Sequence, residues 1–284
     1  MIYEFTSFKE FQEKLAQEKL IEDVSDLTTL NMNFYEGYDE FMIVNFKNFS
    51  GIETNNIMIL SNKDNYVYSG IKWTNYLKSY EKVLKDPDGE STVLFLVVSE
   101  KVLENYNECI KKIHSILSEI DEKTIKRYDI NVDALEDQAM LLRQVTNLVE
   151  DFKEIVVSIK DSKFSFVNSS IAEYDFDVVA AKTQHLLDRC MSLRRYITDL
   201  KYDKDVASTS QLNKNMEKLT RIMAILTIIA NVIAIPNTVA TLYGVSKIAE
   251  HSSTTTILML FFASTLVSIL ISMYIWKKWG FTKK

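Results

Sequence analysis

Polar side chains recur on one face of an otherwise apolar segment near the C-terminus. They follow one another every three or four positions, together with one methionine and one alanine: Thr220, Met223, Thr227, Asn231, Ala234, Thr238 and Thr241. At 100° per residue these positions fall within an arc of about 80° on a helix. Asn237 and Leu226 lie at the edges of the arc. No charged side chain lies among them, so the groups available to bind a ligand are hydroxyl and carboxamide oxygens.

This polar stripe has two interpretations. Small and hydroxyl-bearing residues allow membrane helices to pack closely, so the stripe can serve helix packing alone. Alternatively, symmetry-related copies line a water-filled pore with it. A pore without carboxylates would bind an ion weakly and through its hydration water, which suits Mg²⁺ because this ion dehydrates reluctantly. Pro236 lies in the same segment and removes a backbone donor, so we expect a kink or a loosened turn near Val232.

Two apolar runs are long enough to cross a bilayer. Residues 222–243 give 22 positions without a charged side chain, and residues 257–276 give 20. At a rise of about 1.5 Å per residue, either run covers roughly the 30 Å of a hydrocarbon core. Buried helices of a soluble protein are the alternative, but these rarely stay charge-free for so long. We therefore expect transmembrane helices at 219–243 and 257–276, joined by a loop at 244–256.

Basic residues flank the two runs on one side. Lys214, Lys218 and Arg221 precede the first run, four lysines lie in the tail at 277–284, and Lys247 alone lies between the runs. Positive charge concentrates on the cytoplasmic side of membrane proteins, so both termini are expected to be cytoplasmic and the loop external. The first residues contain no apolar run typical of a cleaved signal, so the large N-terminal part is expected to stay in the cytosol and the spans in the plasma membrane.

Composition excludes several classes of function. The net charge is −6, whereas nucleic-acid binding favours a basic surface. The six glycines are scattered, and the sequence has no HExxH, GxSxG or CxxC motif. Cys109 and Cys190 are far apart and are expected to be ordinary thiols. We therefore expect no enzyme and no cofactor, and the acidic balance is compatible with cations as partners.

The first 110 residues carry the pattern of an α/β domain. Four short runs are rich in β-branched or aromatic residues and predict strands. A turn is expected at SNKDN, between the second and third runs, and the sequence KDPDG precedes the fourth. The four runs are residues 40–46, 55–61, 65–70 and 91–99.

The middle of the chain predicts long helices. Between Gly89 and Pro236 lie 146 residues without glycine or proline, so residues 111–218 are assigned to a helical region. A heptad-like seam at positions 186, 190, 193, 197 and 200 continues without a helix breaker into the first span. One stalk-and-membrane helix of about 70 residues would be roughly 100 Å long, and neighbouring copies must bury it in an oligomer.

A resemblance to a known family now explains the polar stripe. The string LTIIANVIAIPNTVATLYG, residues 226–244, resembles the first transmembrane helix of the CorA family of divalent-cation transporters. In that family L-T-I-I-A and a proline precede the signature Tyr-Gly-Met-Asn and follow a long stalk helix. The C-terminal YIWKKWGF is similar to the end of the family's second span. The order of an α/β domain, long helices and two C-terminal spans extends the resemblance to the whole chain.

The resemblance implies a funnel-shaped homopentamer in which the first span lines the pore and the second lies outside it. Its external filter would be Tyr243, Gly244, Val245 and Ser246, with the glycine letting the chain turn away from the pore helix. Ser246 stands where the signature has asparagine, so this ring would be wider and would hold hydrated Mg²⁺ less well. The pore positions that the resemblance carries over are Thr220, Met223, Leu226, Asn237, Thr241 and Ser246.

Acidic residues outside the spans are further candidates for cation binding. Five copies of Glu250, in the external loop, would form an attracting ring, although solvation of the loop is the simpler account. In the family, acids between neighbouring cytosolic domains bind a metal that holds the pore closed. By resemblance the candidates here are Asp175, Asp177 and Asp203, and a solvated helix face is the alternative.

The sequence therefore predicts a passive, channel-type transporter of divalent cations, with Mg²⁺ expected first and Co²⁺, Ni²⁺ or Zn²⁺ as further ions. Two alternatives stay open. One is a proton-coupled zinc transporter of the same fold, because relatives with variant signatures move zinc and His251 would titrate near neutral pH. The other is a non-conducting scaffold or sensor that has lost its filter, in which Asn231 and Thr227 would tolerate leucine.

Overall fold

Two compact units divide the chain in this computed structural model, residues 1–204 and residues 205–284. The structure describes residues 1–21, 25–49, 55–69, 80–127, 132–161, 166–244 and 253–278. The helix predicted to join stalk and membrane is confirmed as α5 (Glu173–Tyr243), 71 residues long, which contributes to both units. Helix α3 passes through position 110, where the sequence placed the end of the first domain.

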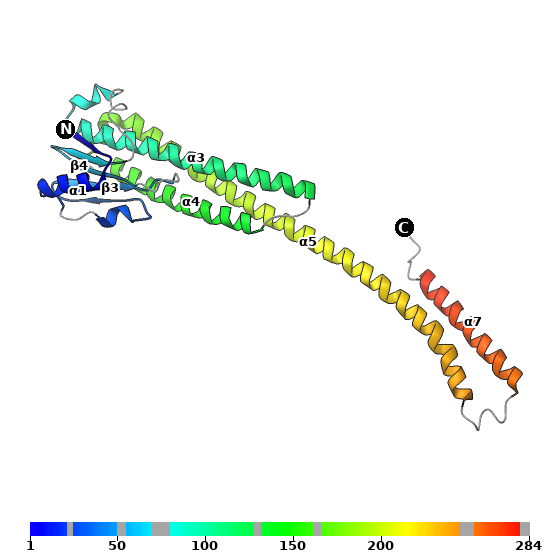
Figure 1. The fold of residues 1–284 in the computed structure, drawn as a ribbon. Helices are drawn as coiled ribbons and strands as arrows, with labels where there is room; N and C mark the ends of the chain where they lie inside the picture. Colours follow the sequence, from blue (N-terminus) through cyan, green and yellow to red (C-terminus); the bar gives the residue numbers. More distant parts are fainter. Residues whose placement is uncertain are drawn as a thin grey trace. The chain divides into compact units, whose positions relative to one another are not determined.

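A five-stranded sheet begins the first unit (Figure 1). Its strands are β1 (Ile2–Phe5), β2 (Phe34–Gly37), β3 (Phe41–Phe46), β4 (Asn56–Ser61) and β5 (Asn65–Tyr68). The order is β1-β5-β4-β3-β2, with β1 parallel to β5 and all other neighbours antiparallel. The turn predicted at SNKDN joins β4 to β5, where the Ser61 hydroxyl donates to the Asp64 carbonyl at 2.6 Å.

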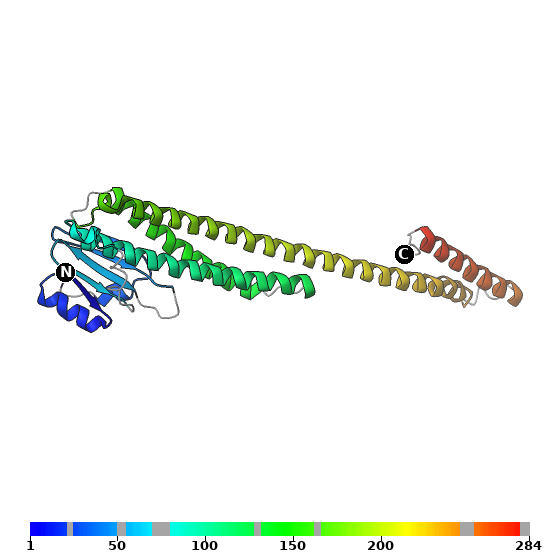
Figure 2. The same ribbon diagram turned by 90° about the horizontal axis from the view of Figure 1, so that it is seen from above.

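The sheet is covered on both faces. Alternate residues of β3 and β4 point in opposite directions, so each face receives its own apolar set. One set packs with α3 (Gly89–Arg127), α4 (Val132–Asp161) and the first part of α5, which run side by side in Figure 2. The other set packs with Phe11 and Leu15 of α1 (Phe8–Gln17), both fully buried. The first unit therefore has three layers.

The strand predicted at residues 91–99 is wrong, because these residues form the first turns of α3. All nine are buried, with helices and sheet around them. A helix buried on all sides needs no polar face, so apolar and polar residues do not alternate with a 3.6-residue period. Its sequence therefore cannot be distinguished from that of a buried strand. The start of α3 is fixed by Gly89, where a Cβ atom would lie 1.9 Å from the Val83 carbonyl oxygen.

The helical region is confirmed in the described residues. Helices α3, α4 and α5 fill almost all of it, with a short 3₁₀ turn at Ser169–Ala172. The predicted heptad seam of α5 is buried, from Leu186 to Leu200, and faces the first unit's core. Beside it, the Tyr196 hydroxyl donates to the Asp121 carboxylate of α3 at 2.6 Å.

Asn33 joins the sheet to the helices. Its side-chain amide donates to the Tyr106 hydroxyl of α3 at 2.9 Å and to the Leu148 carbonyl of α4 at 2.6 Å. Its carbonyl oxygen accepts from the Lys47 amide at 2.7 Å, just after β3. Asn33 is 3% exposed and Tyr106 is fully buried, so no water replaces these bonds if one partner is lost.

Replacing Asn33 by alanine should lower the free energy of unfolding of the first unit by about 2 to 3 kcal/mol, because several buried groups lose their partner. Thermal or urea unfolding of the full chain in detergent, followed by circular dichroism, measures the change. Asn31→Ala is the matched control, since Asn31 is exposed. Equal stability of the two variants would contradict the assigned role of Asn33.

Cys109 and Cys190 are both buried and form no disulfide, which agrees with the expectation that they are ordinary thiols. Burial raises the pKa of Cys109 to about 11 and also raises the pKa of Cys190. At pH 8 only about one Cys109 in a thousand is then a thiolate, the form that reacts. Iodoacetamide should therefore label the folded chain much more slowly than the urea-unfolded chain, and the rate should still rise with pH above 9. A folded-state rate equal to that of a free thiol would refute this.

Candidate ion pathway

The second unit contains two apolar helices, the part of α5 from Asp205 onward and α7 (Thr254–Lys278). Both are long and apolar enough to cross a membrane. Within their most apolar windows only 6% and 11% of residues are buried, whereas the core helix of a soluble protein is mostly buried. Lipid or further protein must therefore cover these surfaces.

The polar stripe of α5 lies exposed. All nine residues predicted to line a pore, namely Thr220, Met223, Leu226, Thr227, Asn231, Ala234, Asn237, Thr238 and Thr241, are exposed on this helix. The protected residues of the same stretch are aliphatic and lie on another face: Ala224, Ile225, Ile228, Val232, Pro236 and Val239. The centres of the two sets are roughly 150° apart around the helix. Helix α7 therefore leaves the polar stripe uncovered.

Helix α7 carries a hydroxyl stripe of its own, which sequence reasoning missed. The protected positions near its middle are Ser264, Thr265, Ser268 and Ser272. The Ser268 hydroxyl donates to the backbone carbonyl oxygen of Asn231 at 3.1 Å, and Ser268 is 1% exposed. Small residues let two helices approach closely, so this stripe makes the packing surface between α5 and α7. The spacing of these hydroxyl residues along the sequence, by one, three and four positions, could have predicted that they share one face of the helix.

The threonine hydroxyls of the α5 stripe are bound to their own helix. Thr220, Thr227 and Thr238 each donate to the carbonyl four residues earlier at 2.8 Å, and Thr241 does so at 2.7 Å. A hydroxyl has one donor and two acceptor lone pairs. Because each hydroxyl hydrogen is donated to a carbonyl of α5, only the lone pairs of the threonine oxygen remain to accept hydrogen bonds from outside the helix. Such a surface suits the outward-pointing hydrogens of water around a cation.

Helix α5 ends in a turn at Gly244, where the sequence predicted that the chain leaves the helix. The Gly244 amide donates to the Ala240 and Thr241 carbonyls, both at 3.1 Å. Its φ lies outside the left-handed region, and a Cβ atom would lie 3.3 Å from the Thr241 carbonyl oxygen, so limited space favours glycine there. Tyr243 is the last residue of α5. The predicted filter residues Val245 and Ser246, with Glu250 and His251, lie outside the described residues.

Two of the three acidic candidates of the first unit lie near lysines. Asp177 forms an ion pair with Lys160 of α4. Burial and the nearby Glu100 carboxylate raise the pKa of Asp175, while Glu100 binds Lys182 at 2.8 Å. Asp203 is exposed. The structure does not bring these three candidates together, and no group of three or more metal-binding side chains occurs in the part of the chain that it describes.

A sheet-and-helix unit, a helix continuing from it, and a second membrane-length helix define a class of two-span membrane proteins. A family model described as CorA-like Mg²⁺ transporter protein matches residues 43–278, and the chain belongs to this family. The predicted family is thereby confirmed. No curated protein gave a significant match to the chain.

Solved structures with this fold confirm the predicted order of an α/β domain, long helices and two apolar C-terminal helices. The complete CorA magnesium transporter from Methanocaldococcus jannaschii aligns with a TM-score of 0.62 at 18% identity, over 98% of this chain and 90% of that one. The full-length CmaX protein gives 0.56 at 13% identity, over 94% and 80%. The soluble domain of the M. jannaschii CorA gives 0.50 at 18% identity, over 68% and 82%. The likeness extends over both units.

Replacing Ser268 by leucine should weaken the packing of α7 on α5 by about 1 to 3 kcal/mol, because the buried contact has no room for a larger side chain. The midpoint of thermal denaturation in detergent reports the loss. Ala263→Leu makes a similar increase in volume at an exposed position of α7 and should leave the midpoint unchanged. If both variants melt alike, the packing surface is wrongly assigned.

Proposed function

We propose that this chain is a passive, channel-type transporter of divalent cations, in which copies of α5 surround the ion pathway of a homo-oligomer, a pentamer by resemblance. One observation carries the proposal. The polar stripe of α5 is exposed, while α7 packs on a different face through its own hydroxyl stripe. The stripe is therefore not needed for packing within the chain and is free to face an aqueous pathway.

The chemistry of the stripe supports a hydrated ion as the transported species. Threonine acceptors and the Asn231 carboxamide can bind water of the first hydration shell without removing it, and no carboxylate lies on the stripe to hold the metal directly. Mg²⁺ keeps its water more tightly than Ca²⁺ does, so it fits this pathway best. The ion gradient and the membrane potential would drive movement, with neither catalysis nor a cofactor.

The remaining parts of the proposal follow the family resemblance. Tyr243, Gly244, Val245 and Ser246 would form the external filter in the plasma membrane, with both termini in the cytoplasm and Glu250 near the mouth. Regulation by metal at Asp177 would require its carboxylate to exchange Lys160 for the ion. Asp175 and Asp203 would need acidic partners from a neighbouring copy.

Replacing Asn231 by leucine should reduce the flux of Mg²⁺ into liposomes at least tenfold, because an apolar ring excludes the hydrated ion. The assay uses purified protein and an internal dye, with Co²⁺, Ni²⁺ and Zn²⁺ in parallel to rank the ions. Ile229→Leu is the control, an exposed aliphatic position off the stripe, and should conduct normally. Size-exclusion chromatography checks that each variant remains assembled.

The same assay separates the alternatives. Unchanged flux in assembled Asn231→Leu would refute a pathway along the stripe. A natural protein that conducts nothing, but conducts after Ser246→Asn, would be a scaffold or sensor with a degenerate filter. Zinc flux that depends on a proton gradient would favour the coupled transporter.

A further inference from the structure

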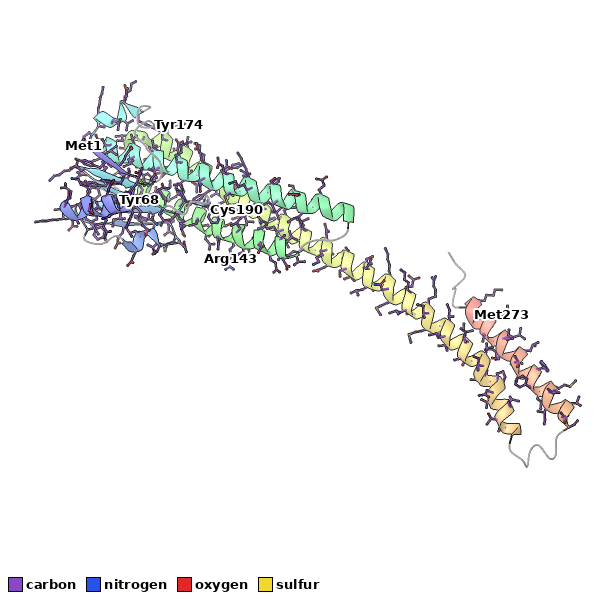
Figure 3. All side chains as sticks on the ribbon, viewed as in Figure 1. Met1, Tyr68, Arg143, Tyr174, Cys190 and Met273 are labelled. Carbon is purple, nitrogen blue, oxygen red and sulfur yellow. The ribbon has the colours of Figure 1, made fainter. Side chains whose placement is uncertain are left out.

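An apolar groove lies between α5 and α7, on the side of α5 away from the polar stripe. It has a volume of about 660 Å³. Ile228 and Val232 of α5 form one wall, and Ile269 and Met273 of α7 form the other. Met273 marks the end of α7 at which the groove lies (Figure 3). This volume is typical of sites that hold small organic molecules, and its walls offer water few partners. An apolar occupant is therefore required.

The groove has a polar end. Tyr274 and Lys277 line it there, and Lys277 is the one charged residue among the described residues that form it. Lysine and tyrosine at the end of an apolar surface are typical of the membrane–water boundary. The groove thus changes from apolar to cationic in the direction in which a lipid molecule changes from acyl chain to headgroup.

Basic residues of α5 reach the same level. The Ser268–Asn231 hydrogen bond fixes the alignment of the two antiparallel helices. Lys277 lies nine residues beyond Ser268, and Arg221 lies ten residues before Asn231, which places them about 14 and 15 Å along the axes from that contact. Arg221 also lies on the face of α5 that carries Ile228, two helical turns away. Arg221 pairs with Glu217 at 3.5 Å but remains half exposed.

We infer that this groove binds one anionic glycerophospholipid from the leaflet on the side of both termini. An acyl chain lies between the walls formed by Ile228, Val232, Ile269 and Met273, and the phosphate contacts Lys277 and Arg221. Cationic pockets between membrane helices recognise lipid headgroups through this combination of charge and apolar surface. The inference rests on the membrane insertion proposed above and does not require conduction.

Charge decides between a lipid and a helix from a second copy. Residues 219–243 and 254–278 contain neither aspartate nor glutamate. A neighbouring span seated in the groove would therefore bring no acidic residue from its apolar segment to Lys277, and the nearest acid of α5, Glu217, is already paired with Arg221. A phospholipid supplies the acyl chain and the negative charge in one molecule.

Native mass spectrometry of the full chain tests the inference, using phosphatidylglycerol and phosphatidylcholine with identical acyl chains. The natural protein should retain about one phosphatidylglycerol per chain in preference to phosphatidylcholine. Lys277→Gln should lower that preference roughly fivefold. Val232→Phe and Ile269→Phe fill the groove without changing charge, and both should lose the bound lipid.

Two controls make the result specific. Leu266→Phe enlarges an exposed residue of α7 outside the groove, and Lys201→Gln removes one positive charge from the first unit; both should bind lipid like the natural protein. Retention of phosphatidylglycerol by both filled variants would overturn the inference, and so would equal retention of the two lipids. Crosslinking of Met273→Cys between copies, with no lipid retained, would identify a second copy as the occupant.

The outcomes also separate this site from the transport proposal. If the chain is soluble without detergent, membrane insertion fails and both proposals fall. If lipid binds as expected but no ion crosses the liposome, transport alone is refuted. If ions cross normally while the filled variants keep their lipid, only the lipid site is refuted.

Discussion

The backbone of a chain inside a bilayer must satisfy its hydrogen bonds internally, and this constraint governs the two apolar helices of the second unit. Helix α5 meets it by continuing without interruption from Glu173 to Tyr243. Only Pro236 lacks a donor within this ladder, and its side chain is buried. Once the backbone is satisfied in this way, the side chains are free to divide α5 into an aliphatic face for α7 and a polar face without an intramolecular partner.

The sequence was sufficient where a local pattern reflects local physics. The strands at 41–46, 56–61 and 65–68 followed from β-branched runs bounded by turn residues, and the long helices followed from the lack of glycine and proline. The error at 91–99 came from burial on all sides, which removes the period that distinguishes a helix from a strand. Strand β1 is short and was not predicted, because its structure depends on pairing with the distant strand β5.

In the candidate pathway too, features set by local spacing were predictable from the sequence, and features set by contacts between distant residues were not. Helical spacing alone predicted that Thr220 to Thr241 share one face, and the structure leaves this face exposed. The packing role of Ser268 depends on Asn231, 37 residues away, and the ion pair of Asp177 depends on Lys160 in another helix. Neither pairing can be predicted from a single amino-acid sequence. Family resemblance supplied the predicted filter and the predicted number of five subunits, which the local spacing of residues does not encode.

The hydroxyl groups of Thr220, Thr227, Thr238 and Thr241 are bound to carbonyls of α5 itself, which has a consequence for biogenesis. A polar stripe that needed partners from other subunits would carry unsatisfied donors whenever a single chain entered the lipid. Here the strongest donors of the stripe are satisfied before any second chain arrives, and the carboxamides of Asn231 and Asn237 carry most of the remaining cost. Insertion of a single newly synthesised chain into lipid would therefore leave none of these four hydroxyl donors without a partner.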